Sequence, residues 1–169
     1  DRNIAFDRLD RDRQRLPISS LTKTMTALLV IEKGRLARKI KVPKAATLVE
    51  PNKEGLLANR WYPRKLLLYS AMLASANDSA YALAADAGNG SLSRFYRKAD
   101  RRARKLGMSD TRYRSPNGLN DDTNLSSARD QAILGRAALE NRTFAAIVRT
   151  KVKNVKWPPP THQKEWVDH

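Results

Sequence analysis

Apolar residues recur at the spacing of an α-helix in several stretches of the chain. The clearest stretch begins with polar residues and turns apolar at Met25, after which Leu28 and Ile31 continue the pattern. This spacing aligns apolar side chains along one face of a helix. Serine and glycine mark several segment ends, because serine caps helix N-termini and glycine suits helix C-termini. The predicted helices cover 20–32, ending at Gly34; 64–74; 78–87; a segment capped by Ser91 and ended by Gly107; and a segment capped by Ser126 or Ser127 that runs to about Asn141.

Strands are predicted near both ends of the chain. Residues 4–7 form a short apolar run, and residues 150–157 alternate imperfectly between apolar and polar until Pro158-Pro159-Pro160 interrupts the pattern. Residues 43–59 are polar and contain proline and glycine, which predicts loops and short strands. Strands from the two chain ends commonly share one sheet in α+β proteins. We therefore expect a single α+β domain over 1–169, with a helix-rich region packed on an antiparallel sheet.

A hydroxyl and an amine lie three residues apart where the first predicted helix begins. Ser20 and Lys23 would face the same side of that helix, so that the Lys23 amine reaches the Ser20 oxygen. A serine hydroxyl becomes a strong nucleophile when a neighbouring base takes its proton. A lysine is such a base when burial or nearby positive charge lowers its pKa. The alternative is an ordinary helix start, with Ser19 or Ser20 as the N-cap and Lys23 in solvent.

A second pair of polar residues falls in the short link between two predicted helices. Ser75 and Asn77 stand there, separated by one alanine. Ser75 can pass a proton to a leaving nitrogen, and Asn77 can hold Lys23 in place or donate to a substrate amide. Each of the two can instead cap the helix that begins near Asp78.

Together these motifs and their flanks resemble those of the low-molecular-mass penicillin-binding proteins, the serine D-alanyl-D-alanine carboxypeptidases. S-x-x-K, a second motif with serine and asparagine, and K-T-G make up the site of this superfamily. The likeness covers most of 3–157, in the family's order. The segments that carry it are 20–28, 73–80, 111–119 (similar to a T-x-F-x-x-P-x-G-L loop), 127–130, 144–148 and 155–157.

The resemblance implies a β-lactamase/transpeptidase-like fold and a serine acyl-transfer enzyme without cofactor or metal. In such an enzyme Ser20 would attack the substrate, Lys23 would be its base, Ser75 would relay a proton, and Asn77 would bind the substrate. The substrate would be a peptidoglycan stem peptide ending in D-Ala-D-Ala, and β-lactam antibiotics would acylate the same serine. The enzyme would act in the cell envelope or outside the cell, with its leader peptide already removed.

One motif of that family is missing, because no lysine in the chain is followed by Thr-Gly. In the family, K-T-G lies on a strand that supplies the substrate carboxylate site and an oxyanion donor. We therefore expect a domain that is incomplete at its end, just before this strand, and at its start. A missing strand implies a weak or inactive enzyme, and an open sheet edge that invites self-association.

The chain is strongly basic. It carries 33 Lys and Arg against 17 Asp and Glu, which gives a formal net charge of +16. Such a field attracts polyanions, and for an envelope protein the natural one is an anionic wall polymer. The densest run, from Arg94 to Lys105, is more typical of an ordinary solvated helix face than of a binding site. No nucleic-acid-binding motif accompanies the charge, and only Phe95 and Tyr96 interleave it, which argues against nucleic acid.

Further features of the sequence argue against a metal site, a membrane-spanning segment and a class A β-lactamase. The chain has no cysteine, and its two histidines, His162 and His169, lack metal-ligand spacing. No apolar run is long enough to cross a membrane. A class A β-lactamase would need a Glu-x-x-x-Asn element after Asn77, which is absent. The remaining alternatives are a catalytically inactive, basic wall-binding module of the same fold and, from charge alone, a nucleic-acid-binding protein.

Overall fold

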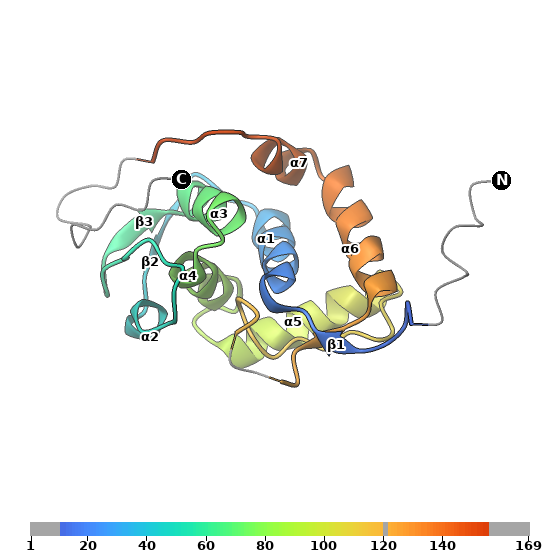
Figure 1. Ribbon diagram of the computed structural model, residues 1–169. Helices are drawn as coiled ribbons and strands as arrows, with labels where there is room; N and C mark the ends of the chain where they lie inside the picture. The colour runs from blue at the N-terminus through green and yellow to red at the C-terminus, as the bar shows by residue number, and fades with distance from the viewer. Residues whose placement is uncertain (1–10, 120–121, 156–169) are drawn as a thin grey trace.

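The computed structural model describes residues 11–119 and 122–155. Within them, helices dominate and the strands are short (Figure 1). The helices are α1 (Thr22–Lys33), α2 (Lys44–Thr47), α3 (Arg64–Leu73), α4 (Asn77–Ala87), α5 (Leu92–Lys105), α6 (Ala128–Glu140) and α7 (Arg142–Val148), and a 3₁₀ turn, Ser19–Leu21, precedes α1. The strands are β1 (Leu16–Pro17), β2 (Lys39–Lys41), β3 (Trp61–Pro63) and β4 (Leu125–Ser126).

Helix α1 is the centre of the fold. It packs against α3, α4, α5, α6 and α7, which surround it in Figure 1. A helix in this position must be apolar around most of its circumference, and α1 buries Met25, Leu28, Val30 and Ile31 on different sides. It ends at Gly34, whose φ of 72° lies in the left-handed region that glycine adopts without strain. The beginning of α1, which carries Ser20 and Lys23, is therefore anchored to the best-packed element of the protein.

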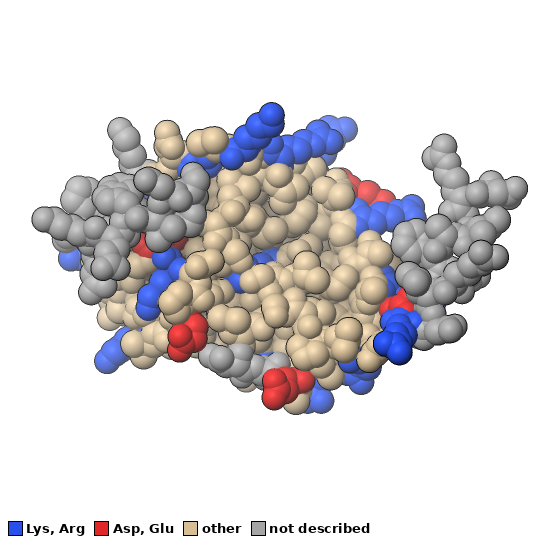
Figure 2. Space-filling model, viewed as in Figure 1, with Lys and Arg blue, Asp and Glu red and all other residues tan. Residues whose placement is uncertain are grey.

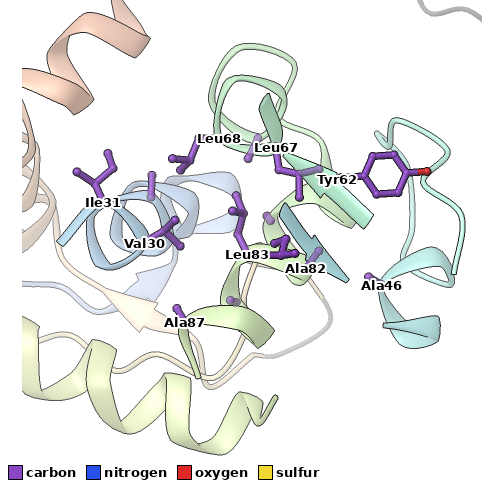
Figure 3. Close-up of a cluster of buried hydrophobic side chains, with 14 of the residues drawn as sticks. Val30, Ile31, Ala46, Tyr62, Leu67, Leu68, Ala82, Leu83 and Ala87 are labelled. Atoms are coloured by element: carbon purple, nitrogen blue, oxygen red, sulfur yellow. The ribbon is translucent and has the colours of Figure 1, made fainter. Parts of the chain in front are cut away.

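The buried side chains form two hydrophobic clusters on opposite sides of α1. The larger one joins Val30 and Ile31 to Leu67 and Leu68 of α3 and Leu83 of α4 (Figure 3). The smaller one joins Met25 and Leu28 to residues of α5, the loop that follows it, and α6, namely Ala99, Ala103, Met108, Tyr113 and Leu134. Because α1 contributes to both clusters, its position is fixed from two sides.

The strands form two small antiparallel sheets. Strand β1 pairs with β4, with Leu16 opposite Ser126, and β2 pairs with β3, with Ile40 opposite Tyr62. The first pairing brings the segment just before Ser20 beside residues more than 100 positions later in the chain. This pairing therefore holds the loop that precedes β4 close to the start of α1.

The sequence predicted the main helices correctly. Helices α1, α3, α4, α5 and α6 match the predicted ranges, with Ser91 and Ser127 as the N-caps of α5 and α6. Together with the antiparallel strands they confirm the helix-rich α+β class.

For the remaining segments, the structure corrects two predictions and does not describe the segment of a third. The loop prediction for 43–59 is wrong in part, because Pro43 leads into the short helix α2, which buries Ala46. The strand predicted over 150–157 is wrong over 150–155, where the chain pairs with no strand and Val152 is 70% exposed. An alternating pattern forms a strand only where one face meets a core and a neighbour supplies hydrogen bonds. The strand predicted over 4–7 lies outside the described residues.

Candidate active site

The structure places Ser20 in the 3₁₀ turn that leads into α1. The Lys23 Nζ donates a hydrogen bond to the Ser20 Oγ at 2.8 Å, because residues three apart in a helical segment share a face. Neither Ser19 nor Ser20 caps a helix with its side chain. The ordinary helix start considered from the sequence is therefore not what this structure shows, and the hydroxyl and the amine are paired.

Lys23 is buried although it carries an ionisable amine. Its relative exposure is 2%, and burial lowers its pKa from 10.5 to about 8. Its Nζ donates a second hydrogen bond, to the backbone carbonyl oxygen of Asn117, at 3.2 Å. An amine with a pKa near 8 is partly neutral at physiological pH, and only the neutral form has a lone pair that can accept a proton. Lys23 thus combines a hydrogen bond to the Ser20 hydroxyl with a lowered pKa.

Ser75 completes a row of three polar groups. It lies in the link between α3 and α4, and its Oγ donates to the Ser20 Oγ at 3.0 Å. Its φ of 55° is in the left-handed region, which is uncommon for a residue with a side chain. The carbonyl oxygen of Ser70 accepts the backbone N–H groups of both Ala74 and Ala76, so the turn around Ser75 is held on each side. Ser75 does not cap α4, and its hydroxyl faces the hydroxyl of Ser20 instead.

Asn77, the fourth residue predicted for the site, makes different contacts. Its Nδ2 donates to the carbonyl oxygens of Glu50 and Pro51, each at 3.0 Å, and its backbone N–H donates to the Asn52 carbonyl oxygen at 2.7 Å. It makes no hydrogen bond to Lys23 in this structure. Its Oδ1 is buried and has no hydrogen-bond partner among the described residues. The structure therefore brings Ser20, Lys23 and Ser75 together, and ties Asn77 to the segment at 50–52.

The next residue, Asp78, also binds the segment that precedes β3. Its carboxylate accepts the backbone N–H groups of Glu54 and Leu56 at 3.1 and 3.0 Å. Burial raises the pKa of Asp78, and these hydrogen bonds act in the opposite direction. The N-terminal end of α4 is consequently tied to the segment from 50 to 56 by both side chain and backbone contacts.

A loop formed by residues 114–119 is docked on the start of α1, and the sequence did not predict this contact. Besides the bond from Lys23 to Asn117, the Thr26 Oγ1 donates to the Pro116 carbonyl oxygen at 2.9 Å. The closest approach is at Gly118, whose φ is 92°. A Cβ built there would lie 1.7 Å from the Ser19 carbonyl oxygen. We call this loop the 114–119 clamp.

The 114–119 clamp is itself held rigid by side chains. The Ser115 Oγ accepts the Gly118 N–H at 2.9 Å, and the Asn124 Oδ1 accepts the backbone N–H groups of Arg114 and Ser115. The Asn124 Nδ2 donates to the Thr22 Oγ1 at 2.8 Å, which links the clamp to the first turn of α1. The sequence offered one signal for this arrangement, the Ser-Pro-Asn-Gly turn, but nothing in it indicates where the turn docks.

Two other features, a metal site and a membrane-spanning helix, are absent from the described part of the chain. It contains no group of three or more His, Asp or Glu residues arranged to hold a metal ion. None of its helices combines the length and the apolar character that a bilayer crossing requires. The chemistry available at Ser20 is thus that of a serine nucleophile, an amine base and a second hydroxyl.

Comparisons with known proteins point to one family. A family model described as D-alanyl-D-alanine carboxypeptidase, Peptidase S11, matches residues 9–168. The D-alanyl-D-alanine carboxypeptidase of Streptomyces sp. (strain K15) is 32% identical over 148 residues, which cover 81% of this chain and 51% of that protein. The D-alanyl-D-alanine endopeptidase of Escherichia coli K12 is 30% identical over 151 residues, which cover 86% and 47% of the two chains.

Solved structures with a similar level of sequence identity share this fold. The Streptomyces K15 DD-transpeptidase superposes with a TM-score of 0.75 at 32% identity, covering 82% of this chain and 57% of that one. The D-alanyl-D-alanine carboxypeptidase from Mycobacterium tuberculosis H37Rv gives a TM-score of 0.75 at 30% identity, covering 82% and 52%. The chain spans about half the length of the curated relatives that it matches.

Proposed function

The chain belongs to the Peptidase S11 family of D-alanyl-D-alanine carboxypeptidases, and from this we propose that it acts as a serine-type carboxypeptidase on peptidoglycan stem peptides ending in D-Ala-D-Ala. One observation carries the proposal: the Ser20 Oγ lies 2.8 Å from the Lys23 Nζ and 3.0 Å from the Ser75 Oγ. This is the arrangement that a serine nucleophile needs, with a base in reach of its proton and a second hydroxyl beside it.

In the proposed reaction, neutral Lys23 takes the proton of the Ser20 hydroxyl. The Ser20 Oγ then bonds to the carbonyl carbon of the penultimate D-Ala, and the bond from that carbon to the nitrogen of the terminal D-Ala breaks. The proton reaches the departing nitrogen through Ser75. Water releases the acyl group, and the hydroxyl of Ser20 is restored. The backbone N–H of Ser20, at the start of a helical segment, is the proposed oxyanion donor.

The proposed function has consequences for inhibition by β-lactams and for where the protein acts. A β-lactam presents a strained acyl carbonyl to the same serine, so we propose that Ser20 is acylated by β-lactam antibiotics. The family is described by its activity on D-alanyl-D-alanine, which is the end of the proposed peptidoglycan substrate, and we therefore propose that the protein acts outside the cytoplasmic membrane. We propose substrate binding for Asn77, whose Oδ1 accepts no hydrogen bond from any residue that the structure describes.

The test is to locate a covalent adduct. The longest form of the protein that its gene encodes is incubated with a labelled penicillin, and the labelled peptide is identified by mass spectrometry. We expect label on Ser20, none in Ser20→Ala, and normal labelling in the matched control Ser93→Ala, which changes an exposed serine on α5. Lys23→Arg keeps the charge but holds its proton near neutral pH, and we expect it to fold and to lose acylation. Label on another serine, or normal acylation in Lys23→Arg, would overturn these roles.

A second candidate function is a catalytically inactive wall-binding module of the same fold, which the net charge of +16 favours. Losing one oxyanion donor alone slows an enzyme by about 10²–10³-fold. Because no Lys-Thr-Gly occurs in the 169 residues, we expect these residues by themselves to release D-Ala slowly. The test compares D-Ala release by this chain with release by the longest form of the protein that its gene encodes. A folded longest form that neither takes up label nor releases D-Ala would favour the inactive module.

A further inference from the structure

Helix α5 carries a concentration of positive charge that the proposed reaction does not use. It runs along the lower part of the molecule in Figure 1 and buries Phe95, Ala99 and Ala103. Its cations all lie on the other side, within about 160° of the circumference at 3.6 residues per turn. These residues are Arg94, Arg97, Lys98, Arg101, Arg102, Arg104 and Lys105.

Three of these cations have a structural role. Arg94 donates to the carbonyl oxygens of Gly88 and Asn89 at 2.9 and 2.6 Å, and Lys98 donates to the Ala87 carbonyl oxygen at 2.7 Å. These carbonyls lie at the C-terminal end of α4, where backbone oxygens lack partners and positive charge is favourable. In addition, Arg102 forms an ion pair of 2.7 Å with a glutamate on α1. Their presence is explained by the fold.

The other four have no such explanation. The side chains of Arg97, Arg101, Arg104 and Lys105 make no hydrogen bond or ion pair with any residue that the structure describes, and all four residues are exposed. They lie within about 100° of the circumference and about 12 Å along the axis. We call them the basic stripe. The acid nearest in sequence, Asp100, is occupied, since its carboxylate accepts the Tyr113 N–H and a guanidinium N–H of Arg114.

The basic stripe does not stabilise the helix as a whole. Like charges three or four residues apart on a helix destabilise it, and Arg97, Arg101 and Arg104 or Lys105 repeat at this spacing. The helix dipole compensates Arg104 and Lys105, which lie in the last turn, but it does not reach Arg97 and Arg101. A ligand with matching negative charge would remove the repulsion.

We propose that the basic stripe binds a linear phosphodiester polymer of the cell wall. Arginine suits this ligand because its planar guanidinium holds a phosphate through two parallel hydrogen bonds. The cations follow one another at about one helical turn, 5–6 Å, so that they can meet successive phosphates of an extended polymer. The choice of a wall polymer rests on the proposed function, whereas the anionic character of the ligand rests on the charge.

The surroundings of the basic stripe argue against two other polyanions. Single-stranded nucleic acid is held by exposed aromatic rings on which bases stack, but Phe95 is buried and Tyr96 packs edge-on against it, away from the stripe. Membrane-surface helices insert an apolar face between lipid headgroups, but the apolar face of α5 is covered by the core. Lys and Arg gather along the rim of the face shown in Figure 2, whose centre carries few charges, so the positive charge is not spread evenly.

The test measures binding of the 169-residue chain to poly(glycerol phosphate) at several salt concentrations. Four phosphate contacts on a single-stranded polyanion give a slope of log K against log salt of about −3. In the variant Arg97→Gln, Arg101→Gln, Arg104→Gln we expect the slope to fall to about −1 and the Kd to rise about ten-fold or more. The matched control changes three exposed arginines outside α5 in the same way, Arg60, Arg142 and Arg149. We expect the control to bind within about two-fold of the unchanged chain.

Each result decides the proposal. Equal losses in the two triple variants would show a response to net charge alone and would overturn it, as would the absence of binding near physiological salt. Tighter binding to single-stranded DNA or to phosphatidylglycerol vesicles would overturn the choice of a wall polymer. A melting temperature confirms that each variant is folded, and Arg101→Glu provides a single-site check that should weaken binding in the same direction. Ser20→Ala should bind normally, which separates this surface from the proposed catalysis.

Discussion

Replacing Gly118 by alanine tests whether the 114–119 clamp holds the nucleophile in place. Gly118 has a φ of 92°, and an added Cβ would lie 1.7 Å from the Ser19 carbonyl oxygen and 2.2 Å from its carbonyl carbon. Both atoms are backbone, so no side-chain rotation can relieve the contact. The clamp and the turn that carries Ser20 must therefore move apart.

The size of this movement follows from the geometry. A Cβ does not approach other atoms within 3.0 Å in real structures, so the gap must open by about 1.3 Å, the difference from the present distance. A displacement of about 1 Å at a reacting group can lower the rate about 10²-fold. The unfavourable φ of alanine adds about 1–3 kcal/mol of strain in the folded state. We expect the acylation rate of Ser20 to fall about 10²-fold, and the free energy of unfolding to fall by a few kcal/mol at most.

The assay is the rate of acylation by a fluorescent penicillin, measured beside urea unfolding of the same sample. Gly135→Ala is the matched control, because a Cβ at Gly135 in α6 meets nothing within 4 Å. It should acylate normally and gain up to about 1 kcal/mol of stability. If Gly118→Ala does not fold, Thr26→Val removes the bond to Pro116 while keeping the side-chain shape, and it should slow acylation about ten-fold. Unchanged acylation in folded Gly118→Ala would refute the positioning role of the clamp.

Three further predictions concern polar and charged side chains. Replacing Lys23 by methionine should abolish acylation yet raise the free energy of unfolding at pH 7, by up to about 3 kcal/mol, since burial lowers the pKa from 10.5 to about 8. Because the unfolded lysine keeps its proton up to pH 10.5, this gain is full below pH 8 and disappears as the pH rises to 10.5, which urea unfolding at pH 6.5 and 10.5 would show. Ser75→Ala should slow acylation of Ser20 by about 10²-fold or more and change the free energy of unfolding by no more than about 1 kcal/mol. An unchanged acylation rate would contradict the proposed proton transfer through Ser75. Asp86→Ala should destabilise the protein by about 3–5 kcal/mol in thermal unfolding, since it leaves the buried Arg64 without its carboxylate partner, and a smaller loss would mean that water reaches the guanidinium.

The local parts of the fold and of the site could be predicted from the sequence. Helical spacing, serine caps and Gly34 predicted α1, and the pairing of Ser20 with Lys23 followed from their separation of three residues. Such features depend on interactions within one or two turns of the chain. The same reasoning found Ser75, because its motif lies between two clear helices, although only the structure shows its distance to Ser20.

The parts that could not be predicted depend on contacts between distant residues. Nothing near Lys23 indicates that its second partner is the carbonyl oxygen of Asn117, 94 positions away. Nor does the sequence show that Asn77 is held by the carbonyls of Glu50 and Pro51, since backbone oxygens carry no residue signature. The prediction for 43–59 missed α2 because one turn of helix, Lys44–Thr47, is too short to show a period.

The docking of the 114–119 clamp also determines when the site can exist during synthesis and folding. The contacts from Thr22, Lys23 and Thr26 span 102, 94 and 90 positions, so they close a loop that contains most of the described chain. Closing so long a loop costs entropy before any contact is gained, which delays distant contacts relative to local helices. A growing chain can form α1 soon after that segment emerges, but Ser20 stays unsupported until residues beyond 118 have been made. We therefore expect the proposed reactivity of Ser20 towards penicillin to be a late marker of folding, and acylation during refolding to follow helix formation.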